Sequence, residues 1–121
     1  MQVVFDGTHF ISGVALQGVP NGGLQPTRYI SEYCVYIHDG RGWKTTLDDG
    51  KTWAFFEGEC QHFVGMPTAA QGEVEFHTPV ESQMVKIVAK AWVPPDLPPA
   101  TQLGIMEKTG TITTNNFNKY F

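Results

Sequence analysis

The sequence predicts an all-β fold in a single domain. Its short apolar runs are separated by turn dipeptides such as Asp39-Gly40 and Asp49-Gly50, which is the pattern of strands joined by tight turns. The 121 residues include 13 glycines and 8 prolines, which is too many for a helical bundle. Hydrophobic residues account for 41% and charged residues for 17%, so the chain can bury a core.

Each expected strand is an apolar or alternating run that ends at a turn. About eight short antiparallel strands are expected, at residues 2–5, 10–17, 29–38, 43–47, 53–56, 73–78, 84–92 and 102–107. This number of short strands predicts a β-sandwich or jelly roll.

One segment fits two kinds of secondary structure. Residues 81–93 contain no glycine or proline, so a helix is one interpretation. Val85, Ile87 and Ala89 belong to a period-two pattern, and the content of β-branched residues is high. This pattern favours a strand with two lysines facing solvent.

Charge and hydropathy exclude several classes of partner. A net charge of −4 argues against nucleic-acid binding, because phosphates need a basic surface. The sequence has no stretch of about 18 apolar residues, so no transmembrane segment is expected. Met1 leads into residues 2–5 without a basic region or a cleavage site, so no signal peptide is expected either.

The cysteines leave two states open. Cys34 and Cys60 are too few for a disulfide-rich scaffold. One bridge between them is compatible with the sequence. A buried free thiol at Cys34, within the apolar run Tyr33-Cys34-Val35-Tyr36-Ile37, is compatible as well.

Two long connections, residues 18–28 and 93–101, contain several prolines and apolar side chains. Strand parity places both of them at one end of the sandwich. Binding residues often lie on such loops because a rigid scaffold holds them in place. A proline-stiffened surface loop without a ligand is the alternative interpretation for each.

The order of five segments resembles a known family. The segments are the apolar strand 10–18, the strand with its Asp-Gly turn and tryptophan in 33–43, the Phe-Glu-Gly of 56–58, residues 76–87, and the strand 103–107. Their order and spacing resemble the discoidin domain, also called the coagulation factor five/eight type C domain, a galactose-binding-like jelly roll. The resemblance covers residues 1–110 and implies an extracellular or surface-exposed protein. The polar segment 111–121 is expected to be a tail or an extra strand.

The chain departs from that family in three respects. The family's domain begins upstream of the strand matched by residues 2–5, and this missing part carries its first strand and two ligand loops. The family's disulfide joins its two ends, and neither Cys34 nor Cys60 matches it. Lys86 stands where the family has arginine. The resemblance therefore implies either a shortened variant or a sheet completed by another chain or a homo-oligomer, because unpaired strand edges attract partner strands.

The resemblance also implies a ligand site on the two long loops. The family's remaining ligand loop corresponds to residues 18–28, with Val19 and Leu24 at its tip. Arg28 could pair with an acidic sugar, and Trp92 could stack on a sugar ring, although a core position is the alternative for Trp92. The predicted ligand-binding residues are Val19, Asn21, Leu24, Gln25, Arg28, Trp92, Asp96 and Leu97.

Residues 46–53, Thr-Leu-Asp-Asp-Gly-Lys-Thr-Trp, fit the Asp-box pattern of a hairpin turn. Its aspartate is expected to cap backbone amides, its glycine to adopt a positive φ, and Trp53 to pack beneath the turn. We interpret this motif as structural.

A second group consists of possible metal ligands, namely Glu57, Glu59, Cys60 and His62. A Cys-x-His pair is at most half of a metal site, so a solvated loop is expected and no metal is predicted.

Little in the sequence favours catalysis. Ser12, Ser31 and Ser82 lie outside any Gly-x-Ser-x-Gly motif, and no glycine-rich phosphate loop opens a helix. We therefore expect no enzyme and no cofactor. Two hypotheses follow. The first is a lectin-like or cell-adhesion module that binds a glycan or a cell-surface protein. The second is a structural subunit of a shell, fibre or appendage.

Overall fold

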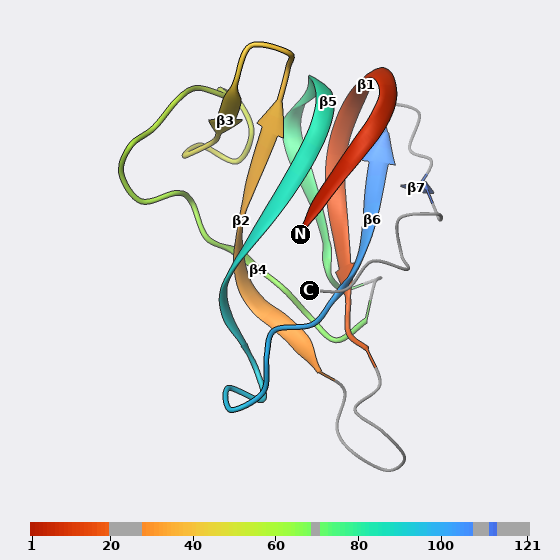
Figure 1. The fold of residues 1–121 in the computed structure, drawn as a ribbon, viewed down its shortest axis with the longest axis vertical. Helices are drawn as coiled ribbons and strands as arrows, with labels where there is room; N and C mark the ends of the chain where they lie inside the picture. Colours follow the sequence, from red (N-terminus) through yellow and green to blue (C-terminus); the bar gives the residue numbers. More distant parts are fainter. Residues whose placement is uncertain (20–27, 69–70, 108–111, 114–121) are drawn as a thin grey trace.

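The computed structural model describes residues 1–19, 28–68, 71–107 and 112–113. These residues form an all-β, antiparallel fold, as the sequence predicts (Figure 1). Its seven strands are β1 (Gln2–Gln17), β2 (Tyr29–His38), β3 (Trp43–Thr45), β4 (Phe63–Val64), β5 (Glu73–Val93), β6 (Gln102–Glu107) and β7 (Ile112–Thr113). Within this part of the chain there is no helix of the length and apolarity needed to cross a membrane.

The sheet has the strand order β3-β2-β5-β1-β6-β7, and β4 pairs with β2. The long strand β5 therefore lies between β2 and β1 and holds the two sides of the molecule together. Figure 1 shows that β1 and β5 both bend over at the top of the view, so each strand belongs to two layers. The result resembles a sandwich.

The bend in β1 and β5 corrects the expected number of strands. Segments 2–5 and 10–17 are parts of one strand, β1, and segments 73–78 and 84–92 are parts of β5. Gly7 lies in the irregular stretch of β1 between Val4 and His9 and has a φ of 89°, a conformation that glycine adopts without strain. Pro79 lies in the irregular stretch of β5 opposite Ser12. Regular pairing between β1 and β5 is interrupted there, so the missing N–H of Pro79 removes no hydrogen bond between the strands. Both turn-type residues therefore bend a strand without ending it.

The shorter elements differ from the prediction in three places. Segment 53–56 is not a strand, since its ladder contact is one isolated bridge between Thr45 and Ala54. Segment 43–47 ends as a strand at Thr45, where the Asp-box turn begins. The two-residue strand β4 was not expected. Strand β7 lies within segment 111–121 and pairs with β6, so this part of the segment forms the extra strand that was one of the two expectations. The bounds of β2 and β6 are as predicted.

The core lies between the two layers and contains alternate residues of the strands. On β2 the core residues are Ile30, Tyr33, Val35 and Ile37, and the last three alternate along the strand, so Cys34 lies on the opposite, outer face. The other strands contribute Val3, Ile11, Val14, Leu16, Phe63, Phe76, Val85, Ile87, Leu103 and Ile105. Full burial of one such side chain contributes about 1.5–3 kcal/mol. Cys34 is nevertheless completely buried, which means that another part of the chain covers it.

Candidate functional site

The described ends of the first long connection lie beside the second connection at one end of the molecule, as strand parity predicts. The backbones of Val19 and Arg28 hydrogen-bond to each other in both directions at the base of the first connection. The Arg28 guanidinium donates a hydrogen bond to the carbonyl oxygen of Pro98 in the second connection. The ends of the two connections are therefore held together by one side chain.

The predicted ligand residues have different surroundings. Val19 is buried and lies at the base of its loop, because its backbone continues the ladder, so the prediction that it stands at the tip is wrong. Asp96 is exposed, and Leu97 is half-buried. Asn21, Leu24 and Gln25 lie outside the described residues.

Trp92 lies at the end of β5, beside the second connection. Its indole N–H donates to the carbonyl oxygen of Leu97 at 2.8 Å, which fixes the ring. Part of the ring packs against the core. Trp92 also lines a shallow depression of about 210 Å³ together with Lys90, Ala91 and Pro95. The side chain thus makes the core contact that the sequence left as one alternative, and it also forms an accessible wall of the depression.

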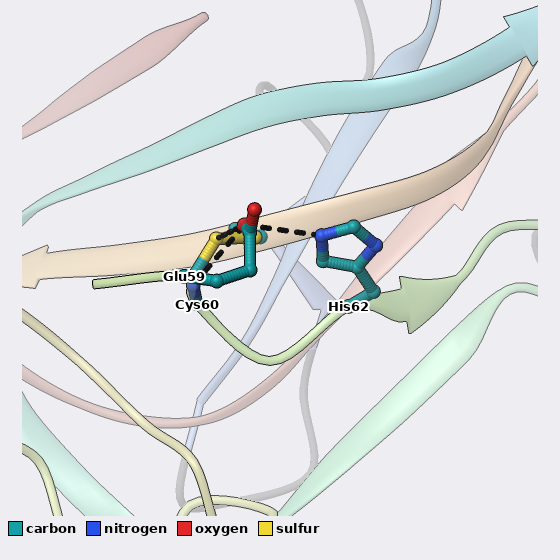
Figure 2. A group of neighbouring side chains, drawn as sticks. Glu59, Cys60 and His62 are labelled. Atoms are coloured by element: carbon teal, nitrogen blue, oxygen red, sulfur yellow. Dashed lines mark hydrogen bonds and ion pairs between the residues drawn. A yellow bond between two sulfur atoms is a disulfide. The ribbon is translucent and has the colours of Figure 1, made fainter.

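A second group of side chains lies on the outer face of β2. Cys34 of β2 and Cys60 form a disulfide with a Cα–Cα distance of 6.0 Å. This bond joins the segment before β4 to the sheet and explains why Cys34 is buried on an outer face. Figure 2 shows Glu59 and His62 beside the two sulfur atoms. Glu59 Oε1 lies 3.3 Å from Cys60 Sγ and also accepts a hydrogen bond from the Cys60 amide.

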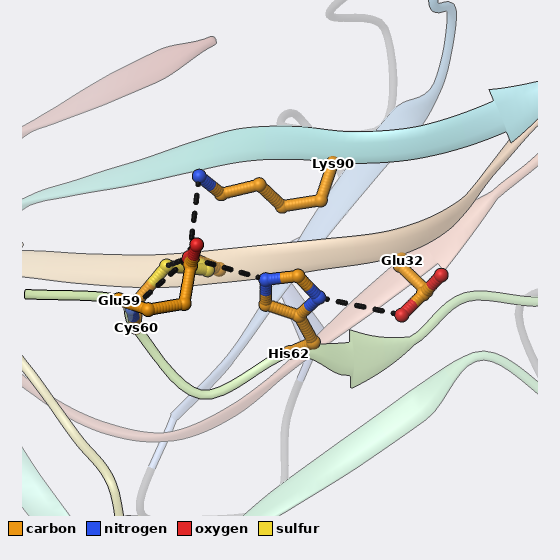
Figure 3. A network of polar contacts seen from close by, with 6 residues as sticks. Glu32, Glu59, Cys60, His62 and Lys90 are labelled. Atoms are coloured by element: carbon orange, nitrogen blue, oxygen red, sulfur yellow. Dashed lines mark hydrogen bonds and ion pairs between the residues drawn. A yellow bond between two sulfur atoms is a disulfide. The ribbon is translucent and has the colours of Figure 1, made fainter.

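His62 stands between two carboxylates (Figure 3). Its Nε2 lies 3.2 Å from Glu59 Oε1, and its Nδ1 lies 3.3 Å from Glu32 Oε1. These two carboxylates, Glu59 first, raise the pKa of His62. The pKa of Glu59 is lowered, mainly by His62 and then by Lys90, whose Nζ lies 3.4 Å away. The group is therefore an ion-pair network at the edge of the disulfide.

We define the cysteine–histidine cluster as Cys34, Glu59, Cys60 and His62. Each of its residues offers one atom of a metal-ligand type, and these atoms all lie within 4.8 Å of one another. The sequence pattern predicts three of the four residues as possible ligands but not Cys34, because Cys34 lies 26 positions from Cys60. The available signal was strand parity, which places Cys34 and Glu32 on the same outer face of β2.

The Asp box has the predicted turn geometry. Asp48 Oδ1 accepts the Thr52 amide at 2.9 Å, and Gly50 has a φ of 83°. Thr46 Oγ1 accepts the Gly50 amide at 2.8 Å. Trp53 packs edge-on against Phe76 with 4.9 Å between ring centroids. The motif therefore orders the loop that leads to Cys60.

No protein-family model matches the sequence, and no curated protein matches it. The resemblance to discoidin domains therefore rests on the sequence segments described above. Lys86, at the position of the family's arginine, lies over the rings of Tyr36 and Trp43, at 5.1 and 4.3 Å from their centroids.

Proposed function

We propose that this chain is a non-enzymatic recognition module that binds carbohydrate at the end of the fold where the two long connections meet. The observation that carries the proposal is the depression beside Trp92. A sugar ring presents an apolar face of C–H groups, and an aromatic wall is a suitable surface for it. A shallow depression suits a ligand that remains partly in water, such as the terminal sugar of a cell-surface glycan.

Polar groups suited to sugar hydroxyls lie in the depression and on the loop that follows Trp92. Asp96 is exposed on the loop that begins at the end of β5, and Lys90 lines the depression itself. The Arg28 guanidinium is held over the same loop by its bond to Pro98. A guanidinium has five N–H donors, so Arg28 retains donors for a hydroxyl or an acidic sugar.

The test is glycan binding by the wild type and two matched tryptophan variants. Trp43 is half-buried like Trp92, but it pairs with His38 at the opposite end of β2. Immobilised neutral and acidic glycans identify a ligand, and calorimetry then measures its affinity. We expect Trp92→Leu to weaken binding about 10-fold or more and Trp43→Leu to leave it unchanged.

Two results would overturn this proposal. One is a folded wild-type protein that binds no glycan in the screen. The other is binding that Trp92→Leu and Trp43→Leu weaken equally, because the effect would then report on stability. Binding to a glycoprotein that survives removal of its glycans would assign the ligand to the protein part instead.

A structural or assembly subunit is the second candidate. Among the described residues, β6 pairs with β7 at Ile105 and Met106, so four of the six β6 residues show no ladder partner on that side. Val4 and Val64 are also 67% and 64% exposed. Light scattering on the purified chain separates the candidates, since a mass near 13.4 kDa favours the recognition module and a defined larger mass favours assembly.

A further inference from the structure

The cysteine–histidine cluster combines donors that one metal ion prefers. Zn²⁺ takes sulfur, imidazole nitrogen and carboxylate oxygen ligands in tetrahedral sites, at about 2.3 Å for sulfur and about 2.0–2.1 Å for nitrogen. The cluster offers two sulfurs, one imidazole and one carboxylate within 4.8 Å of one another. The ligands come from β2 and from the segment 59–62, so a metal would join the same two parts of the chain as the disulfide does.

The orientation of His62 supports this interpretation. Its Nε2 faces Glu59 and the sulfur atoms, while its Nδ1 faces Glu32 on the other side (Figure 3). Histidines that bind metals usually direct one nitrogen to the ion and the other to a carboxylate or carbonyl. Glu32 is therefore in the position of the supporting carboxylate.

The charges around the cluster also suit a divalent cation. The two thiolates and the Glu59 carboxylate together carry three negative charges. A bound Zn²⁺ ion neutralises two of them and leaves one. Lys90, 3.4 Å from Glu59, supplies the matching positive charge. Cys34 and Cys60 are both buried, so the sulfur side of the site is shielded from water, while Glu59 and His62 remain exposed. An ion can therefore enter from the exposed side.

We propose that the cluster binds one Zn²⁺ ion when the Cys34–Cys60 disulfide is reduced. Two molecules of a thiol, RSH, supply two electrons and two protons and become one disulfide, RSSR. The Cys34–Cys60 bond breaks and two thiols form. Zn²⁺ then binds both sulfurs as thiolates, and their two protons pass to water. The same position thus holds a covalent bond under oxidising conditions and a metal under reducing conditions, and this does not depend on the proposed carbohydrate site.

The experiment uses Co²⁺ as a spectroscopic probe for Zn²⁺. The full chain is reduced with a phosphine, separated from the reductant without oxygen, and titrated with Co²⁺. We expect one equivalent to produce thiolate-to-cobalt absorption in the near ultraviolet, and Zn²⁺ to abolish it. The oxidised chain should show no such absorption.

Variants assign the ligands and the supporting carboxylate. Cys60→Ser should lower the thiolate-to-cobalt absorption to about half or less, because one of the two sulfurs is removed, and His62→Ala should weaken Zn²⁺ binding. Glu32→Gln should weaken it about 10–100-fold, the effect usual for a supporting group. The matched controls are His77→Ala and Glu75→Gln, which change exposed residues outside the cluster and should leave the affinity unchanged.

The proposal is wrong if the reduced wild type shows no thiolate-to-cobalt absorption, or if His62→Ala and His77→Ala bind Zn²⁺ equally well. If reduction of the disulfide unfolds the chain, circular dichroism measures whether Zn²⁺ restores the β structure. Recovery of the β spectrum at one equivalent of Zn²⁺ would support the proposal, because the ion would then couple binding to folding. A reduced chain that stays unfolded with and without Zn²⁺ would overturn it.

Discussion

At Gly50 the backbone has a φ of 83°, and the amide donates to Thr46 inside the Asp-box turn. A β-carbon at this position would lie 2.6 Å from the β-carbon of Phe76. Gly50→Ala therefore combines left-handed backbone strain with overpacking, and we expect it to destabilise the protein by about 2–4 kcal/mol. The measurement is the free energy of unfolding in urea.

Gly58→Ala is the matched control for Gly50→Ala. No atom lies within 4 Å of a β-carbon at Gly58, and this glycine lacks the positive φ of Gly50. We expect a change of at most about 1 kcal/mol, in the stabilising direction if the backbone conformation suits alanine. Equal losses in the two variants would contradict the packing that we describe for the Asp box.

His62 makes stability depend on pH in a defined direction. Its pKa is raised by Glu59 and Glu32, so its contribution is complete below the ordinary histidine pKa of about 6.5 and is lost as the pH rises through the raised value. The pKa of Glu59 is lowered, so its contribution is complete above the ordinary glutamate pKa of about 4.3 and is lost as the pH falls through the lowered value. Both contributions are therefore present between these ordinary values.

We expect His62→Gln to lower the thermal midpoint of the oxidised, metal-free chain most within that pH window. The difference from the wild type should shrink above it, and His77→Gln serves as the control. The midpoint is measured by circular dichroism at several pH values. A difference that grows as the pH rises past the histidine range would contradict the ion-pair geometry.

At the scale of elements, the Cys34–Cys60 bond joins β2 to the segment that follows the Asp box. It closes a loop with a sequence separation of 26, for which the loss of unfolded-state entropy stabilises a protein by about 2–4 kcal/mol. We expect a phosphine reductant to lower the free energy of unfolding of the metal-free chain by this amount. Urea unfolding measures the change. The Cys34→Ser, Cys60→Ser double variant should not respond to the reductant, and a wild type that is equally insensitive would contradict a structural role for the bond.

The elements also show where sequence patterns succeed. The bounds of β2 and β6 were predicted because each is an apolar run that ends at turn residues. β4 was missed because two residues carry no periodicity. The fusion of segments into β1 and β5 was missed because local rules make Gly7 and Pro79 turn residues. In the structure the ladder between β1 and β5 is irregular at these two positions and resumes beyond each of them.

At the scale of the whole molecule, the sheet bends over on itself and encloses one core. Strand parity predicted that the two long connections lie at one end, and the bond from Arg28 to Pro98 confirms that their ends meet. The jelly-roll connectivity of discoidin domains stays a prediction, as does carbohydrate binding. The continuous strands β1 and β5 explain how this chain can connect two layers with few strands.

Sequence patterns alone were sufficient to predict the all-β class, the alternation of core and outer residues, and the Asp-box turn. These properties depend on neighbours within a few positions, through side-chain alternation, glycine conformations and short-range capping. The folded structure was needed to establish that Cys34 lies beside Cys60 and His62. It was also needed to establish that Trp92 packs on the core and lines a depression. The physical reason is that strand register and loop placement are set by burial between residues far apart in the chain, which no local pattern records.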